Sequence, residues 1–253
     1  MNINDKNMIK ILVLLNNYFS NNSVDKLAEV EYPEEIEYGT NEWLCYIFYS
    51  CLLDYGMRSK VYHNNLIHTY HSHKNIFKPN YVIDNFKNDS SELVKIIKEN
   101  IHPRYPNIAV KKWLTLSEKL NEFDNLLDKI KEFKNIYEVY FFIQSIHCYG
   151  QKTGGLLLRL IYESNICKFF DDIFIIPIDR HDLEISYLNG VVDTIKLNSK
   201  QIRDLSLAYV KTANKLGIKP DNIDKYLWEI GNKFCDKKDC VHCPLYSNCA
   251  KKL

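Results

Sequence analysis

The sequence predicts an all-α protein. Apolar side chains recur at helical spacing along most of the chain, and no strand alternation is convincing before residues 173–178. Glycine and proline are scarce, at 8 and 7 residues, whereas tyrosine and phenylalanine contribute 18 and 12. This composition argues against disorder and against a turn-rich β protein. A chain of 253 residues is long enough for one large domain or two smaller ones.

Helix signals in the first half of the chain are clear. Helices are expected over residues 5–19, 41–53, 57–73 and 90–100. Thr40 or Asn41 supplies a side-chain oxygen suited to cap the second of these. Gly56 is a typical helix-stop residue for its end.

In the second half, two prolines within residues 102–107 predict a loop, because proline blocks helix continuation. Further helices are expected over residues 108–120, 122–133, 135–147, 151–160, 180–188, 198–216 and 221–234. The apolar run 173–178 is too short for a helix, and we interpret it as a buried connection.

A tight turn leads into an apolar helix at residues 146–160. Gly150 opens this helix, and backbone N–H groups at a helix start are suited to bind a phosphate oxygen. Lys152 lies in the first turn, where burial and the positive helix end favour the neutral amine, which is the nucleophilic form. Such an amine attacks a sugar C1′ and forms a Schiff base. Two other interpretations remain open, a lysine that only contacts phosphate and a solvated lysine.

Asp179 follows Pro177 and precedes the helix expected at 180–188, with Asp182 three residues further on. This spacing places Asp179 at an N-cap. A capping carboxylate is also held rigidly and stays ionised, which suits it to stabilise a developing sugar cation or to relay protons. Asp179 either only caps the helix or also takes part in catalysis. Both interpretations remain open, because one residue can do both.

Four cysteines gather in the last 19 residues in the pattern Cys-x4-Cys-x2-Cys-x5-Cys, namely Cys235, Cys240, Cys243 and Cys249. Clustered cysteines in a cytosolic chain are more typical of a metal site than of disulfides. The compact loop has a single Cys-x2-Cys pair, which favours a [4Fe-4S] cluster over zinc. We expect His242 to be a bystander, and Cys45 and Cys51 to be buried as small apolar residues.

Charge is unevenly distributed although the net charge is only +1. Residues 1–50 carry 3 basic and 8 acidic side chains, whereas residues 200–253 carry 11 basic and 6 acidic ones. One basic face would suit a phosphate backbone, although solvated helix surfaces explain the same pattern. No apolar run approaches the roughly 20 residues of a membrane span, and no signal peptide is recognisable. We therefore expect a cytoplasmic, nucleoid-associated protein.

Four histidines fall close together in the helix expected at 57–73. Only two of them share helical spacing, and no carboxylate or cysteine pattern joins them: His63, His68, His71 and His73. A solvated or partly packed helix explains them better than a metal site does.

The turn with its lysine, the run Pro177-Ile178-Asp179-Arg180-His181 and the terminal cysteine loop together resemble the helix-hairpin-helix DNA glycosylase superfamily. The cysteine loop is most similar to that of endonuclease III. The run Gln151-Lys152-Thr153 and the segment before Asp179 are similar to archaeal 8-oxoguanine DNA glycosylases, which lack the cluster. Three features differ from the family pattern: Cys148 stands in place of the first hairpin glycine, the first cysteine spacing is short, and the separation of 27 residues between Lys152 and Asp179 is long.

The resemblance implies two helical domains, one formed by residues 41–166 and ending in the hairpin, the other by residues 1–40 and 167–253 with the cluster. It implies that Lys152 forms the Schiff base and that Asp179 is the essential aspartate. It further implies a target nucleotide flipped from the duplex into a cleft. DNA contacts are implied for Gly150, Gln151, Thr153, Arg180 and His181, and cluster ligation for Cys235, Cys240, Cys243 and Cys249.

The expected function is therefore a base-excision-repair DNA glycosylase with abasic-site lyase activity, removing a damaged, oxidised base from double-stranded DNA. We expect a monomer without a membrane partner. Two alternatives stay open: a monofunctional glycosylase in which Asp179 activates water, and a non-catalytic iron–sulfur protein that binds nucleic acid. Tyr55, Tyr149 and Phe142 are candidates for stacking on a base, or members of the core.

Overall fold

The computed structural model describes residues 1–24, 31–54, 58–167, 169 and 173–250. These residues form helices and connections, and none of them forms a named strand. A lone antiparallel bridge pairs Ile3 with Val192. The predicted all-α class is confirmed.

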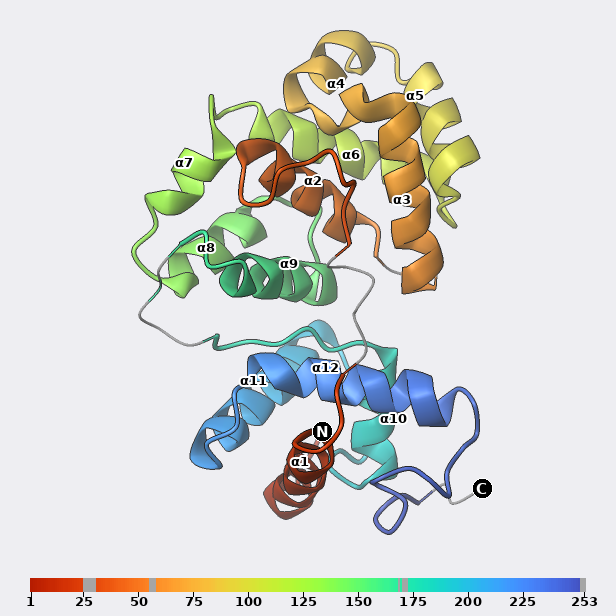
Figure 1. The fold of residues 1–253 in the computed structure, drawn as a ribbon, viewed down its shortest axis with the longest axis vertical. Helices are drawn as coiled ribbons and strands as arrows, with labels where there is room; N and C mark the ends of the chain where they lie inside the picture. Colours follow the sequence, from red (N-terminus) through yellow and green to blue (C-terminus); the bar gives the residue numbers. More distant parts are fainter. Residues whose placement is uncertain (25–30, 55–57, 168, 170–172, 251–253) are drawn as a thin grey trace. The chain divides into compact units, whose positions relative to one another are not determined.

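The chain divides into two compact units, which we describe separately (Figure 1). The terminal unit comprises Met1–Asp25 and Asp172–Leu253, and the central unit comprises Lys26–Asp171. Residues 31–40 lie in the central unit, whereas the family resemblance implies that residues 1–40 form one domain with residues 167–253. The Tyr38 hydroxyl anchors them there by donating a 2.9 Å hydrogen bond to the Ser164 carbonyl.

The central unit is a set of helices around a largely aromatic core. The helices are α2 (Asn41–Leu52), α3 (Ser59–His73), α4 (Pro79–Phe86), α5 (Ser91–Ile96), α6 (Pro106–Leu120), α7 (Leu126–Lys131), α8 (Ile136–Ser145) and α9 (Gln151–Glu163). Helix α2 is buried on nearly all sides, since each residue from Trp43 to Leu52 is buried. The Tyr49 ring stacks on Trp113 with 4.5 Å between centroids, and the Trp113 indole donates to the Ile76 carbonyl.

Helix boundaries follow the capping chemistry. Thr40 is the N-cap of α2, because its hydroxyl accepts a 3.2 Å hydrogen bond from the Trp43 N–H. Helix α7 is shorter than the expected 122–133, because the Asn125 side chain caps a new start by accepting from the Asp128 N–H. Helix α4 and the 3₁₀ turn Lys74–Phe77 were not anticipated. The expected helix 90–100 is α5 continued by a π-helical turn, Ile97–Ile101. Gly56, expected to stop α2, lies outside the described residues.

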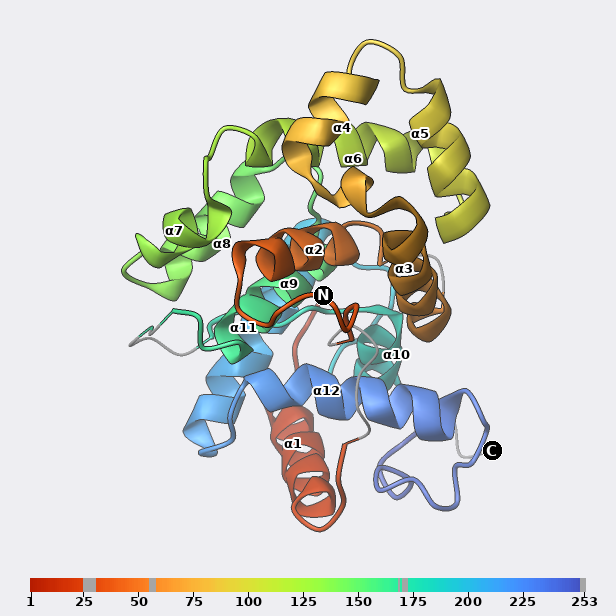
Figure 2. The same ribbon diagram turned by 45° about the horizontal axis from the view of Figure 1, so that its top comes forward.

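The terminal unit contains α1 (Asp5–Phe19), α10 (Arg180–Leu188), α11 (Ser199–Lys215), α12 (Asp221–Ile230) and the π-helical turn Gly231–Cys235 (Figure 2). Its core gathers apolar side chains from all of these elements, including Leu12, Ile185, Tyr209 and Leu227. The helix predicted over residues 5–19 is confirmed, and its core face includes Met8, Leu12 and Leu15.

Residues 173–178 form the predicted buried connection rather than a strand or helix. The backbone of Ile176 is satisfied by one side chain, since the Ser206 hydroxyl accepts from its N–H and donates to its carbonyl, both at 2.8 Å. These two hydrogen bonds hold the segment that leads to Asp179 against α11. Among the described residues, no helix is long and apolar enough to span a bilayer.

Candidate functional site

Helices α8 and α9 form a hairpin joined by residues 146–150 (Figure 1). The turn is tight, because the N–H groups of Cys148 and Tyr149 both donate to the Ile146 carbonyl, at 2.7 and 3.1 Å. Gly154 allows α9 to pack closely on α8, since a Cβ there would lie 2.8 Å from Gln144 Nε2. The hairpin thus presents the start of α9 as a fixed structure.

Gly150 is exposed at the start of α9, and its own N–H is already used. It donates a 3.1 Å hydrogen bond to the Thr153 hydroxyl, and Thr153 is buried. A phosphate at this helix start would therefore be met by the N–H groups of Lys152 and Thr153, which precede the first intrahelical bond at Gly154. A Cβ on Gly150 would meet no atom within 4 Å, so packing does not require glycine here. The open space leaves room for a ligand against the backbone.

The Lys152 amine is fixed by a residue that sequence reasoning did not identify. Nζ donates a 2.9 Å hydrogen bond to the Asp54 carbonyl and lies 3.7 Å from Asp54 Oδ2. The lysine side chain is 33% exposed, whereas the Asp54 side chain is only 5% exposed. Asp54 follows the end of α2, so Lys152 bridges the start of α9 and the negative end of α2. The amine is held in place and remains accessible.

A buried group of tyrosines supports this contact. The Tyr149 hydroxyl donates a 2.6 Å hydrogen bond to the Phe48 carbonyl in α2, and the Tyr62 hydroxyl donates at 3.4 Å to Tyr49. Burial, and then the Asp54 charge, raise the pKa of Tyr62 well above its usual value. Tyr149 is therefore part of the core and not available to stack on a base. Phe142 is likewise buried, against Phe48 and other rings, and Tyr55 lies outside the described residues.

Asp179 is the N-cap of α10, as the sequence predicts. Its Oδ1 accepts from the N–H groups of His181 and Asp182, at 2.7 and 3.1 Å. Asp182 completes the capping box by accepting from the Asp179 N–H at 2.7 Å. The side chains of Asp179 and Asp182 also interact directly, and this contact adds to the effect of burial, which raises the pKa of Asp182. The Asp179 carboxylate is therefore held in one orientation.

A second carboxyl group lies beneath Asp179. Asp182 is 2% exposed, and burial raises its pKa well above the usual range, helped by the charges of Asp179 and Asp224. Asp224 belongs to α12 and is also buried, at 4% exposed. Three carboxyl groups in this small volume of the terminal unit favour a protonated Asp182.

His181 packs tightly on the end of α12. A Cβ added to Gly231 would lie only 2.5 Å from His181 Cγ, so the imidazole rests directly on the backbone of the π-helical turn. His181 Nε2 lies 3.6 Å from the Asp236 carboxylate. Arg180, by contrast, is exposed to solvent. Of these two predicted DNA contacts, the structure leaves Arg180 accessible and holds His181 in a packed position.

The cysteine loop is anchored to the terminal unit at two points. Leu245 is 1% exposed and belongs to its core, and the Ala250 N–H donates a 2.8 Å hydrogen bond to the Leu188 carbonyl. Between these anchors the chain turns repeatedly, with Cys243 N–H donating to the Cys240 carbonyl at 3.1 Å. His242 points into solvent, 77% exposed, and pairs with Asp239.

The four thiols lie near one another. Burial raises the pKa of Cys235 to about 12, with smaller contributions from the charges of Cys243, Cys249 and Cys240. Burial also raises the pKa of Cys243 to about 11, with Cys249 and Cys240 adding to it. As they stand, no three histidine, cysteine or acidic side chains of the described residues meet closely enough to hold one metal ion. The donor set nevertheless fits a four-thiolate cluster in type and number.

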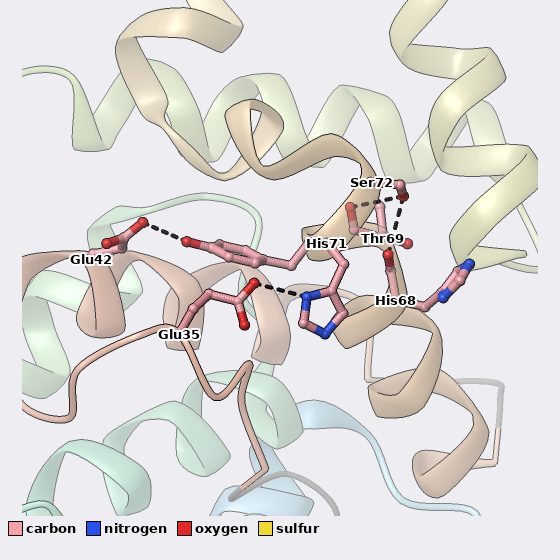
Figure 3. Close-up of polar contacts among 7 residues, drawn as sticks. Glu35, Glu42, His68, Thr69, His71 and Ser72 are labelled. Carbon is pink, nitrogen blue, oxygen red and sulfur yellow. Dashed lines mark hydrogen bonds and ion pairs between the residues drawn. The ribbon is translucent and has the colours of Figure 1, made fainter.

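The histidines of α3 belong to the central unit, and Figure 3 shows two of them, His68 and His71. His71 Nδ1 pairs with Glu35 at 2.8 Å in an exposed position, and His68 points away from both. The nearby Glu42 accepts a hydrogen bond of 2.5 Å from the Tyr70 hydroxyl. Both residues line a cavity of about 670 Å³ at the start of α2, the opposite end of that helix from Asp54. None of the predicted site residues lines it.

Comparison with family models, curated proteins and solved structures finds no match for this chain. Its chemistry therefore has to be argued from its own residues. The structure brings Gly150, Lys152 and Thr153 together in the central unit. In the terminal unit it brings Asp179, Arg180 and His181 together, and separately the four cysteines.

Proposed function

We propose that this protein is a DNA glycosylase with abasic-site lyase activity, acting in the cytoplasm on damaged double-stranded DNA of the nucleoid. The observation that carries the proposal is the Lys152 amine. It lies in the first turn of α9, partly exposed, fixed by Asp54 and two residues from the open face of Gly150. An accessible amine beside a helix start combines a nucleophile with an anion site, which suits an abasic sugar and its phosphate.

In the proposed reaction, Lys152 Nζ attacks C1′ of the damaged nucleotide, and the bond from C1′ to the base breaks. The base leaves with the bonding electrons and takes up a proton. Nζ, which attacks as the neutral amine, then loses a proton. The C1′–O4′ bond breaks, O4′ keeps the bonding electrons and takes up a proton, and Nζ and C1′ form the C=N bond of a protonated Schiff base. This Schiff base acidifies the sugar C2′ proton. Loss of that proton expels the 3′ phosphate by β-elimination and cuts the strand.

Asp179 is assigned the stabilisation of positive charge on the sugar and a part in proton transfer. The geometry of its carboxylate supports this role, because two N–H groups hold Oδ1 in a fixed position. Arg180 and the N–H groups of Lys152 and Thr153 are the proposed phosphate contacts.

The four cysteines are proposed to hold a [4Fe-4S] cluster through their thiolates. When bound, the cluster would serve as a rigid cross-link of the loop. Lys233, Lys237 and Lys238 surround the cysteines, and their positive charge suits both an anionic cluster and a DNA backbone.

A specific observation favours a second candidate, a monofunctional glycosylase. The Lys152 amine already donates a hydrogen bond to the Asp54 carbonyl and lies 3.7 Å from the Asp54 carboxylate, contacts that are typical of a lysine that only binds phosphate. If the lysine keeps its proton, it only binds phosphate, and Asp179 activates a water molecule instead. The two candidates differ in whether a covalent protein–DNA intermediate forms.

Borohydride trapping tests the proposal. Duplexes that carry 8-oxoguanine, thymine glycol, uracil or an abasic site are incubated with the protein and reduced. A covalent adduct is expected for the wild type and for Lys129→Gln, a control at an equally exposed, ion-paired lysine of the same unit, and no adduct for Lys152→Gln. Base release without an adduct or strand cleavage would favour the monofunctional enzyme. Binding without base release would leave only a nucleic-acid-binding protein.

A further inference from the structure

The segment 95–112 is strongly basic in a chain whose net charge is only +1. It carries five basic side chains and a single acidic one, Glu99. Four of the five cations are exposed and make no ion pair within the described part of the chain: Lys95, Lys98, Arg104 and Lys111. Because these charges stabilise no contact of the fold, they are available to attract an anionic partner.

Two of these cations flank an exposed apolar area where α6 begins at Pro106. The Arg104 guanidinium lies 5.4 Å from the centre of the Tyr105 ring, and Ile108 and Lys111 share one face of α6 through their spacing of three residues. Tyr105 and Ile108 are 51% and 52% exposed. Arg104, Tyr105, Ile108 and Lys111 are called the α6 surface below.

The α6 surface lies at the same end of the central unit as Lys152. Leu120 is the last residue of α6 and Asn41 the first of α2, and both line the same cavity. Trp113, in the middle of α6, stacks on Tyr49 in the second half of α2. The two helices therefore run in opposite directions, so that α6 begins toward the end of α2 that contacts Lys152.

Lys112 links the α6 surface to the hairpin turn. This lysine is half-buried, and burial lowers its pKa while Cys148 in the turn opposes the shift, which places the two side chains near each other. From Pro106 to Lys112 the helix rises by about 9 Å, which corresponds to roughly two to three nucleotides of one DNA strand. A strand bound at Gly150 could therefore continue along the start of α6.

We propose that the α6 surface binds the phosphate backbone of duplex DNA beside the hairpin, with Arg104 and Lys111 each contacting one phosphate. The choice of DNA as partner rests on the proposed function. Exposed, unpaired cations supply the attraction, and the apolar area between them suits the sugar rings that separate successive phosphates. Contacts of this kind position the protein on the duplex without reading its sequence.

The salt dependence of DNA binding tests the proposal. Binding of an undamaged fluorescent duplex is measured by anisotropy over a series of salt concentrations, for the wild type and Arg104→Gln/Lys111→Gln. Each lost phosphate contact should reduce the slope of log K against log salt by about 0.9, so the double variant should lose about 1.8. At about 0.15 M salt this change corresponds to an affinity about 30-fold weaker. Each single variant should show half the change in slope.

A matched control separates a local contact from the effect of overall charge. Lys74→Gln/Lys78→Gln removes the same charge from two exposed lysines beside the cavity at the opposite end of α2, and should retain the wild-type slope. Equal slopes for the wild type and Arg104→Gln/Lys111→Gln, or equal losses in both double variants, would overturn the proposal. Poly-glutamate that binds as tightly as DNA, and equally loses affinity in Arg104→Gln/Lys111→Gln, would instead assign the surface to an acidic protein.

The proposed function can fail separately, because the duplex in this titration carries no lesion and no reaction occurs. A reduced slope in Arg104→Gln/Lys111→Gln, together with no base release and no trapped adduct on any damaged duplex, would support the α6 surface and refute the glycosylase. Trapping by the wild type with an unchanged slope in the double variant would support the glycosylase and refute the α6 surface.

Discussion

Gly231→Ala tests whether the contact between His181 and the end of α12 is as close as the structure places it. A Cβ at residue 231 would lie 2.5 Å from His181 Cγ, 2.6 Å from its Cβ and 2.6 Å from its Nδ1. Carbon atoms prefer about 3.5–4.0 Å. The clashing atoms include Cβ and Cγ, the part of the side chain next to the backbone. Relief therefore requires α10 or the π-helical turn to move.

The expected cost follows from two opposing terms. Overpacking of a well-packed site costs about 1–3 kcal/mol. Alanine has a higher helix propensity than glycine, so the substitution in a helical segment also stabilises the folded state by about 1 kcal/mol. The net expectation is a loss of up to about 2 kcal/mol in the free energy of unfolding, and a shift of α10 that moves the Asp179 cap. Activity, where it is measured, should fall with it.

Urea unfolding of four proteins measures this contact. They are the wild type, Gly231→Ala, His181→Ala and the double variant. Removing the imidazole relieves the contacts with Cγ and Nδ1 but leaves the one with the Cβ of residue 181, so the double variant should recover part of the loss, about 1 kcal/mol, relative to additive effects. Additive effects in the double variant would refute the close packing.

Three further predictions concern the rest of the candidate site. Gly150→Ser should leave the free energy of unfolding unchanged or raise it, because the new side chain meets open space and serine is a good N-cap. If phosphate approaches this backbone, the same variant should bind DNA about tenfold more weakly in a fluorescence titration. Asp182→Asn should be more stable than the wild type at pH 8, with the difference vanishing near pH 4. The folded state retains a proton on Asp182 that the unfolded chain releases near pH 4, so wild-type stability falls as pH rises above that value, and equal pH profiles of unfolding would contradict this. Cys243→Ser should abolish the visible absorbance and iron content of protein purified without oxygen, whereas Cys167→Ser should preserve both.

Local structure was predictable where short-range chemistry determines it. The helix 5–19, the Thr40 cap and the Asp179 capping box follow from neighbours within three or four residues, and all three are confirmed. Helix α4 was missed even though Pro79 stands at its first turn, a favourable position for proline. Its sequence is rich in asparagine and aromatic residues, which have weak helix propensity, so its packing in the central unit has to supply the remaining stability.

Long-range contacts escaped prediction. Asp54 follows an apolar helix without any spacing signal, and its contact with Lys152 arises only when α2 packs on α9. Gly231 falls inside the expected helix 221–234, where nothing nearby in sequence calls for glycine, and the reason for it is a histidine 50 residues earlier in the chain. Similarly, the Gly150 N–H was expected to bind phosphate but is occupied by the Thr153 hydroxyl. Such pairings depend on tertiary structure, which periodicity does not encode.

In the proposed reaction the Lys152 amine forms the covalent bond to DNA, and the site of attachment tests this most directly. The borohydride-reduced adduct is digested with protease and nuclease, and the modified peptide is sequenced by mass spectrometry. We expect a single attachment, to Lys152. Attachment to the N-terminal amine or to another lysine would contradict it, even if base release and strand cleavage were both observed.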